Sequence, residues 1–206
     1  MRTEQRRVEE LIQLGLQQLG CNLPSGPFFN YLALLQKWNQ TYNLTAVRDM
    51  ESMVSRHLLD SLSILPWIKG PRVLDVGSGA GLPGIPLAIA CPKLQVVLLD
   101  SNGKKIRFLQ EAKRVLALSH LDIVQTRAES YHPTQAFDTV TSRAFGSLDQ
   151  LIHGTQHLIS KGGIWLAMKG RRPDAELAGI THPFRIEPYK VGGMVDARCC
   201  VIVESF

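Results

Sequence analysis

The sequence is poor in cysteine and has no long apolar run. Its four cysteines form no C-x-x-C pair and have no histidine partners at metal-ligand spacing, a pattern that disfavours zinc sites and disulfide frameworks. No stretch approaches the roughly 20 consecutive apolar residues that a membrane span needs. The N-terminus leads into a polar amphipathic pattern rather than the apolar core of a secretory signal. We therefore expect a cytoplasmic protein with reduced thiols, no membrane contact and no bound metal.

Length and charge set only broad limits. With 206 residues, the chain is long enough for one domain with an extension, and 45% of its residues are hydrophobic. Lysine and arginine number 23 and the acidic residues 18, which gives a formal net charge of +5. This excess permits a polyanionic partner such as RNA, although many soluble enzymes are equally basic.

One stretch, residues 73–90, has the features of a nucleotide-binding site. A short apolar run ends on Asp75 and Val76 and is typical of a buried parallel strand. Four glycines follow within eight positions, and then an apolar segment with helical spacing. Glycines at this density let the backbone turn sharply and approach a ligand, and the N-terminus of the next helix points its free N–H groups at the same place.

Two cofactor classes compete for this loop. Residues 79–84 fit the dinucleotide pattern G-x-G-x-x-G, which is a weak signal on spacing alone. A carboxylate such as Asp75 at the mouth of the loop would repel a pyrophosphate, whereas S-adenosylmethionine has an ammonium, a sulfonium and ribose hydroxyls that an acid can bind. A second apolar run ends on Asp100, where a ribose-binding carboxylate is expected. We favour S-adenosylmethionine; the alternative is that Asp75 caps a turn and Asp100 a helix.

The order of the remaining elements predicts an α/β fold. Three amphipathic helices are expected first, over residues 4–19, 28–42 and 50–65, the last ending at Pro66. They would form an N-terminal helical cap over residues 1–68, joined in one compact unit to a Rossmann-like domain over residues 69–206. In that domain, strands alternate with helices, as in a parallel sheet. The strands are expected at 72–76, 95–100, 121–125, 137–141 and 163–168, the helices at 83–91, 103–117 and 147–158, and an antiparallel edge hairpin at 184–191 and 198–203.

Ligands in open parallel sheets collect outside the carboxyl ends of the strands. The first three of these ends supply candidate cofactor contacts, which are Asp75, Gly77, Ser78, Gly79, Leu82, Asp100, Ala128 and Glu129. The fourth and fifth supply Arg143 and the basic group Lys169–Arg172. Either cation could hold an RNA phosphate or a guanine edge; the alternative for Lys169–Arg172 is a solvated loop. His57 is expected to have a structural role, because no nucleophile lies near it in the sequence.

Two absent motifs narrow the acceptor. No Asn-Pro-Pro-Tyr follows the fourth strand, as enzymes that methylate adenine amines use, and no Pro-Cys nucleophile is present there, as methylation of a cytosine ring carbon requires. Guanine N7 fits what remains, since it already has a lone pair, loses no proton and needs no general base. Such catalysis would depend on orientation and on tolerating the positive charge that moves onto the base.

Several blocks together resemble the ribosomal RNA small-subunit methyltransferase G family, also called the glucose-inhibited division protein B family. They follow one another in order along nearly the whole chain. The blocks are Lys37-Trp38-Asn39, Tyr42–Thr45, Arg56-His57 with Asp60-Ser61, Asp75–Pro86, Leu99–Ser101, Ser142–Phe145 and Ala167–Gly170. One departure lies in the tail, where the family usually has Gly-Glu-Arg and this chain has Asp196-Ala197-Arg198.

The resemblance implies a class I S-adenosylmethionine-dependent methyltransferase fold with a seven-stranded, mostly parallel sheet and an N-terminal helical extension. It also implies N7 methylation of one guanosine in the decoding region of 16S ribosomal RNA, presented as free RNA or in the small ribosomal subunit, by an enzyme that we expect to be a monomer. Carried over by position, Gly77, Leu82, Ala128-Glu129 and Arg143 resemble the family's cofactor contacts, and Arg143 is also our candidate catalytic residue. Three alternatives stay open: another S-adenosylmethionine-dependent RNA methyltransferase, a nicotinamide-dependent oxidoreductase that uses the same loop, and a non-catalytic RNA-binding module.

Overall fold

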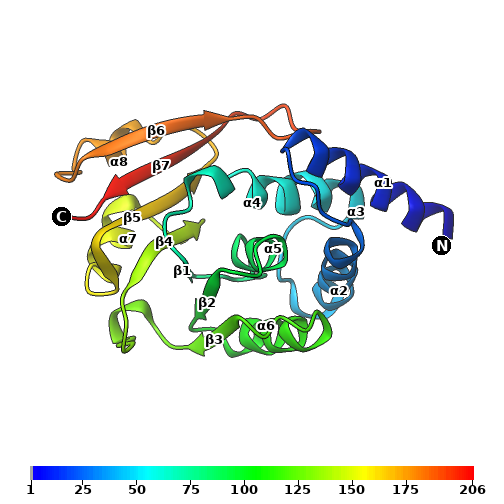
Figure 1. The fold of residues 1–206 in the computed structure, drawn as a ribbon, viewed down its shortest axis with the longest axis horizontal. Helices are drawn as coiled ribbons and strands as arrows, with labels where there is room; N and C mark the ends of the chain where they lie inside the picture. Colours follow the sequence, from blue (N-terminus) through cyan, green and yellow to red (C-terminus); the bar gives the residue numbers. More distant parts are fainter. Residues whose placement is uncertain (1) are drawn as a thin grey trace.

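Residues 2–206 are described by a computed structural model, in which one seven-stranded sheet forms the centre of the molecule (Figure 1). The strand order is β3-β2-β1-β4-β5-β7-β6, and β7 runs antiparallel to both of its neighbours. The predicted, mostly parallel sheet with an antiparallel hairpin at one edge is thereby confirmed. The strands are β1 (Arg72–Val76), β2 (Gln95–Asp100), β3 (Leu121–Gln125), β4 (Phe137–Arg143), β5 (Ile159–Lys169), β6 (Phe184–Tyr189) and β7 (Arg198–Glu204).

Two strands of the parallel part of the sheet differ from their predicted bounds, and in the edge hairpin β6 ends two residues earlier and β7 one residue later than predicted. β4 continues to Arg143, which therefore lies on the strand rather than after it, and pairs with Met168 of β5. β5 begins at Ile159 instead of residue 163, because an irregularity in the β4–β5 pairing lets Ile159 pair with Phe137 before the regular register resumes at Ile164. The lengthening of β4 carries its end further toward the edge of the sheet where ligands are expected, whereas β5 is lengthened mainly at its opposite, amino end.

Helices cover both faces of the sheet. α5 (Gly84–Ala90) and α6 (Gly103–Val115) pack on one face, while α7 (Leu148–Thr155) and the short α8 (Asp174–Leu177) lie on the other. Alternate strand residues face opposite ways, as the pleat requires: Val73 faces the α6 side, and Leu74 the α7 side. The loop after β3 contains only a 3₁₀ turn, η3 (Ala128–Ser130).

The first two N-terminal helices agree with the sequence pattern. α1 (Arg2–Gln18) and α2 (Gly26–Tyr42) are single α-helices. Pro27 occupies the first turn of α2, where its fixed φ and missing N–H are tolerated, and Asn43 ends the helix in the left-handed conformation.

The helix predicted over residues 50–65 is present but is not a regular α-helix, and its continuous part ends at Leu62. α3 (Met50–Met53) is followed by a π-helical segment η1 (Val54–Leu59), the short α4 (Asp60–Leu62) and a 3₁₀ turn η2 (Leu65–Trp67). Pro66 lies inside that last turn instead of marking the end of the helix. The π-segment appears as the bond from the Asp60 N–H to the carbonyl of Ser55, five residues back. Segments of this kind are often found at functional sites.

The N-terminal helices and the sheet domain share one hydrophobic core. Ile12, Leu35 and Leu58 belong to the same buried cluster as Val96 of β2 and Leu109 of α6. Figure 1 shows α1 and α2, in blue, on the side of the molecule that also holds α5 and α6. The Tyr31 hydroxyl of α2 donates a 2.8 Å hydrogen bond to the carbonyl of Ala80, so α2 directly supports the glycine-rich loop. Within the described residues, none of the helices is long and apolar enough to span a bilayer.

Candidate functional site

Two cavities lie next to each other at the carboxyl ends of the strands. The first, which we call the loop cavity, has a volume of about 340 Å³. The second, the arginine cavity, has a volume of about 400 Å³ and shares Ala144 and Phe145 with the first. The loop cavity is lined by Gly77, Leu99, Asp100, Ser101, Lys105, Thr126, Arg127, Ala128, Glu129, Ala144 and Phe145.

The glycine-rich loop reaches the loop cavity through Gly77, its first residue. Gly77 has φ +68°, and a Cβ at this position would lie 2.7 Å from Cδ2 of Phe145. At Gly84, the first residue of α5, a Cβ would lie 2.2 Å from a methyl of Leu98 and 2.8 Å from Oδ2 of Asp75. A side chain at Gly77 would therefore displace the Phe145 ring, and one at Gly84 would displace Leu98 or Asp75 in the strands beneath the loop.

Asp75 does not lie at the mouth of the loop, as the sequence led us to expect. Its side chain is fully buried under the loop, where Oδ2 accepts a 2.9 Å hydrogen bond from the Gly84 N–H and Oδ1 has no partner. Burial raises the pKa of Asp75 to about 7, against the opposing effect of the Gly84 N–H. In this geometry Asp75 binds the backbone where the loop enters α5, a structural role close to the turn cap that the sequence left open as the alternative.

Asp100 lies in the loop cavity, as predicted, and it also holds the loop. One of its oxygens accepts from the Gly79 N–H at 3.0 Å and lies 3.4 Å from Nζ of Lys105, and the other accepts from the Asn102 N–H at 2.9 Å. A carboxylate offers about four acceptor positions, so one remains for a ligand hydroxyl.

The other predicted cofactor contacts divide into two groups. Gly77, Ala128 and Glu129 line the loop cavity together with Asp100, and Glu129 forms no hydrogen bond or ion pair within the described part of the chain. Ser78, Gly79 and Leu82 do not line it. The Ser78 hydroxyl donates to the carbonyl of Asp75 at 2.8 Å, and Leu82 is buried in the core, so both act on the shape of the loop.

Arg143 lies in the arginine cavity and does not line the loop cavity, where we had placed it among the cofactor contacts. Arg143 is the last residue of β4, and its side chain contacts the N-terminal helical segment. Its guanidinium donates to the carbonyl of Arg56 at 2.8 Å, lies 3.4 Å from Oδ2 of Asp60, and lies 3.3 Å from Nδ1 of His57. All three partners belong to η1 and the start of α4.

A buried carboxylate is the centre of the arginine cavity. The Asp60 side chain is 3% exposed and forms ion pairs with Arg143 and, at 3.3 Å, with Nε of Arg198 on β7. Its Oδ1 also accepts a 2.9 Å hydrogen bond from the Tyr189 hydroxyl of β6. One carboxylate thus connects three strands to the helical segment, and it balances only one of the two arginine charges.

His57 is buried beside this carboxylate and is held from both sides. Its Nε2 lies 2.7 Å from the Thr45 hydroxyl, and its Nδ1 faces Arg143. Burial, reinforced by the charge of Arg143, lowers the pKa of His57 to about 4, so the imidazole is neutral at physiological pH. Neither ring nitrogen is free to take a proton from a substrate.

Basic residues at the rim of the arginine cavity are mostly paired. Lys169 forms a 2.9 Å ion pair with Glu176 and donates to the carbonyl of Gly146, so it is not the solvated residue of the alternative interpretation. Arg172 is exposed and paired with Asp174. Asp196, in the tail motif that departs from the family pattern, lies 3.5 Å from Arg56 at the same rim.

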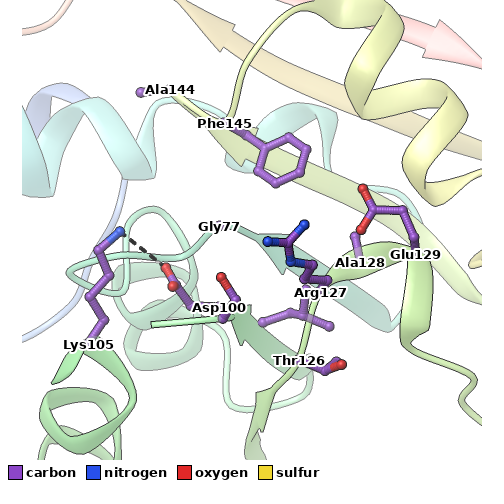
Figure 2. Close-up of a pocket in the computed structure, with 11 residues that line it drawn as sticks. Gly77, Asp100, Lys105, Thr126, Arg127, Ala128, Glu129, Ala144 and Phe145 are labelled. Atoms are coloured by element: carbon purple, nitrogen blue, oxygen red, sulfur yellow. Dashed lines mark hydrogen bonds and ion pairs between the residues drawn. The ribbon is translucent and has the colours of Figure 1, made fainter. Parts of the chain in front are cut away.

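Sequence reasoning missed several lining residues. Lys105 lies in a basic helical run of the kind that usually faces solvent. Arg127 was not among the predicted site residues, although the next residue, Ala128, was. Figure 2 shows Arg127 and Phe145 pointing into the loop cavity from opposite sides. The grouping of Asp60 with Tyr189 and Arg198 depends on contacts across more than a hundred residues; only the family blocks Arg56-His57 and Asp60-Ser61 gave a signal for it.

The loop cavity fits the donor that the sequence suggests. Asp100 and Glu129 offer carboxylate oxygens to hydroxyl or cationic groups, and the cavity lies against a loop whose glycines admit close backbone approach. When bound, S-adenosylmethionine would supply an activated methyl group; the chain supplies the cavity that holds and orients it.

The chain matches the family described as GidB, rRNA small subunit methyltransferase G, over residues 27–195. It is 56% identical to the ribosomal RNA small subunit methyltransferase G of Legionella pneumophila (strain Philadelphia 1), covering 97% of this chain and 96% of that protein. The protein of the same name from Coxiella burnetii (strain Dugway 5J108-111) is 46% identical, covering 95% and 98%. Among solved structures, a SAM dependent methyltransferase from Aquifex aeolicus has a TM-score of 0.59 at 15% identity, covering 85% of this chain and 98% of that chain. This likeness confirms the predicted fold class.

Proposed function

The chain belongs to the ribosomal RNA small subunit methyltransferase G family, and from this premise we propose that it transfers a methyl group from S-adenosylmethionine to N7 of one guanosine in 16S ribosomal RNA. The observation that carries this proposal is the pair of adjoining cavities. One has the glycine loop and carboxylates that suit the donor. The other has cations and no free base among the described residues, because His57 and Asp60 are both engaged.

A cavity without a free base favours an acceptor that loses no proton. N7 supplies the electron pair for the new C–N bond, while the C–S bond of the donor breaks with its pair staying on sulfur. The positive charge passes to the base, and no proton is released. Exocyclic amines and ribose hydroxyls must lose a proton during or after methylation, which this cavity is poorly equipped to accept.

In this proposal the residues divide between two tasks. Asp100, Gly77 and Ala128-Glu129 hold the donor, while Asp75, Ser78, Gly79 and Leu82 keep the loop in shape beneath it. Arg143 acts in the arginine cavity as the catalytic residue that contacts the acceptor. The guanidinium has five N–H groups, and the contacts with η1 and Asp60 leave some of them for the guanosine or its phosphate.

We also propose that the helical cap over residues 1–68 and the domain over residues 69–206 act together as a monomer in the cytoplasm. Three of the exposed large apolar side chains, Leu14, Val115 and Phe184, lie on the separate elements α1, α6 and β6. Light scattering during gel filtration would test this state.

Product mapping tests the central proposal. The protein is incubated with labelled S-adenosylmethionine and either small ribosomal subunits or free 16S ribosomal RNA, and the modified nucleotide is located by mass spectrometry. The expected product is a single N7-methylguanosine. Methylation of an exocyclic amine or a ribose would reject the acceptor and favour another RNA methyltransferase activity.

The two remaining alternatives have their own test. A ligand that binds the native state raises its melting temperature. S-adenosylhomocysteine should raise it and NADH should not; the reverse result would favour the oxidoreductase. Donor binding with RNA binding but no methyl transfer to any RNA substrate would favour the non-catalytic module.

A further inference from the structure

Phe145 occupies the boundary between the two cavities. It lines both the loop cavity and the arginine cavity, and its ring lies against the α-carbon side of Gly77. Figure 2 shows the ring projecting from the end of β4 into the space between Gly77 and Glu129. A methyl group that passes from one cavity to the other must therefore pass close to this ring.

The turn that carries Phe145 is anchored at both ends. Before it, Arg143 is fixed by its contacts with Arg56, His57 and Asp60. After it, Ser147 and Gln150 form a capping box at the start of α7, and Lys169 donates a 3.1 Å hydrogen bond to the carbonyl of Gly146.

The turn itself is strained. Ala144 has φ +58°, a left-handed conformation that residues other than glycine rarely adopt. Strained backbone of this kind clusters at functional sites, where the surrounding structure maintains it. Two anchors and a strained residue hold one partly exposed aromatic ring at the junction of the cavities.

We propose that Phe145 is the surface on which the target guanine stacks, with the ring face stabilising the positive charge that the base acquires. This inference rests on the proposed function and identifies a further acceptor-binding residue for it. Bases stack readily on aromatic side chains. An aromatic face also attracts a cation, so the contact is stronger after the charge has moved onto the base than before.

The other aromatic residue of the arginine cavity is less suited to this role. The Tyr189 ring packs edge-on against Trp67, at 5.8 Å between centroids, and its hydroxyl is bonded to Asp60. Phe145 has no hydroxyl to be satisfied and lies on the side of the cavity that faces the donor. A base stacked there would have its edge directed at the arginines and its N7 near the boundary with the loop cavity.

Substitutions at Phe145 test the proposal by separating the methyl-transfer rate from donor affinity. In Phe145→Leu, which keeps an apolar side chain without a ring, we expect the single-turnover rate with small subunits to fall about 10- to 100-fold. The dissociation constant of S-adenosylhomocysteine should stay within about threefold of wild type, because the loop cavity keeps its other contacts. Phe145→Tyr should restore most of the rate.

A fluorinated series distinguishes cation stabilisation from simple packing. Replacement of Phe145 by phenylalanines with increasing fluorine content keeps the shape but weakens the negative ring face. The rate should fall stepwise along this series at constant donor affinity. These analogues also decide the question if the leucine variant does not fold.

Three results would overturn the inference. They are a wild-type rate in Phe145→Leu, a flat fluorinated series, and a loss of donor affinity that accounts for the whole loss of rate. Wild-type protein assayed in parallel separates this from the proposed function: if it forms no N7-methylguanosine, the proposed function fails, and if it does while Phe145 variants keep the full rate, only the stacking role fails.

Discussion

The loop cavity and the arginine cavity differ in which parts of the chain form them. The loop cavity is formed by residues at or shortly after the ends of β1 to β4, and it includes Gly77, where a side chain would meet the Phe145 ring. The arginine cavity is formed by side chains from η1, β4, β5, β6 and β7, and its shape depends on one buried carboxylate. The donor side is therefore encoded mainly in local segments, whereas the acceptor side exists only after the whole sheet has formed.

The largest effect should come from removing that carboxylate. In Asp60→Ala, Arg143 and Arg198 lose their common partner, and breaking a buried pair of this kind costs about 3–5 kcal/mol of unfolding free energy. Urea denaturation measures the loss. The matched control is Asp196→Ala at the rim, an exposed pair with Arg56 that should change the unfolding free energy by less than about 1 kcal/mol. Equal losses in the two variants would contradict the central role of Asp60.

Burial shifts the pKa values of His57 and Asp75, and their contributions to the unfolding free energy should change with pH in opposite directions. The lowered pKa of His57 means that the unfolded state takes up its proton first, so stability from His57 is lost as pH falls from 6.5 to about 4. The difference between these values corresponds to about 3 kcal/mol. The raised pKa of Asp75 has the opposite sign, because the folded state keeps its proton longer, and stability is lost as pH rises from 3.8 to about 7.

These two pH responses are checked by measuring the unfolding free energies of wild type, His57→Gln and Asp75→Asn between pH 4 and pH 8. The difference between wild type and His57→Gln should grow in favour of wild type as pH rises through the His57 window. The difference between wild type and Asp75→Asn should shrink as pH rises through the Asp75 window. Parallel curves for any variant and wild type would show that the group concerned does not titrate as its burial implies.

A glycine pair tests the loop cavity. Gly77 and Gly79 both have positive φ, so alanine is strained at either position, but only at Gly77 does the new Cβ meet the Phe145 ring. Donor affinity should fall about 10- to 100-fold in Gly77→Ala and distinctly less in Gly79→Ala. Titration calorimetry with S-adenosylhomocysteine measures both; a larger loss at Gly79 would show that strain, and not the clash, controls the cavity.

The smallest effect is expected when Arg143 is replaced, and it should change the rate of methyl transfer alone. In Arg143→Ala, the rate of methyl transfer to small subunits should fall about tenfold or more, because a charged hydrogen-bond donor is lost from the arginine cavity. Donor affinity should not change, since Arg143 lies outside the loop cavity. Arg143→Lys keeps the charge but not the forked geometry and should rescue only part of the rate. A wild-type rate in Arg143→Ala would leave this residue with a structural role only.

The sequence predicted the loop cavity better than the arginine cavity for a physical reason. The strand before Asp75, the glycines after it and the acid at Asp100 are local patterns whose meaning depends on nearby residues. Even there, the sequence predicts Asp75 at the mouth of the loop although it is buried beneath it, because spacing does not specify on which side of a turn a side chain lies. The contacts among Asp60, Tyr189 and Arg198 depend on strand order and register, which no local pattern contains.

The π-helical segment shows the same limit. Periodicity predicted a regular helix over residues 50–65, since its apolar residues keep nearly helical spacing. The extra residue in η1 lies where tertiary contacts gather: Thr45 on one side of His57, and Arg143 with Arg198 around Asp60. Tertiary contacts have overridden local preference at the place where the arginine cavity is built.

That segment also limits how the gene can change. An α-helix turns by roughly 100° per residue, so deleting a single codon within η1 would regularise the helix while rotating Asp60 away from Arg198 or His57 away from Thr45. No single amino-acid replacement reproduces that rotation. Substitutions can change the side chains around the arginine cavity one at a time. A one-residue deletion within η1 would instead remove the acceptor side in one step and leave a more regular helix.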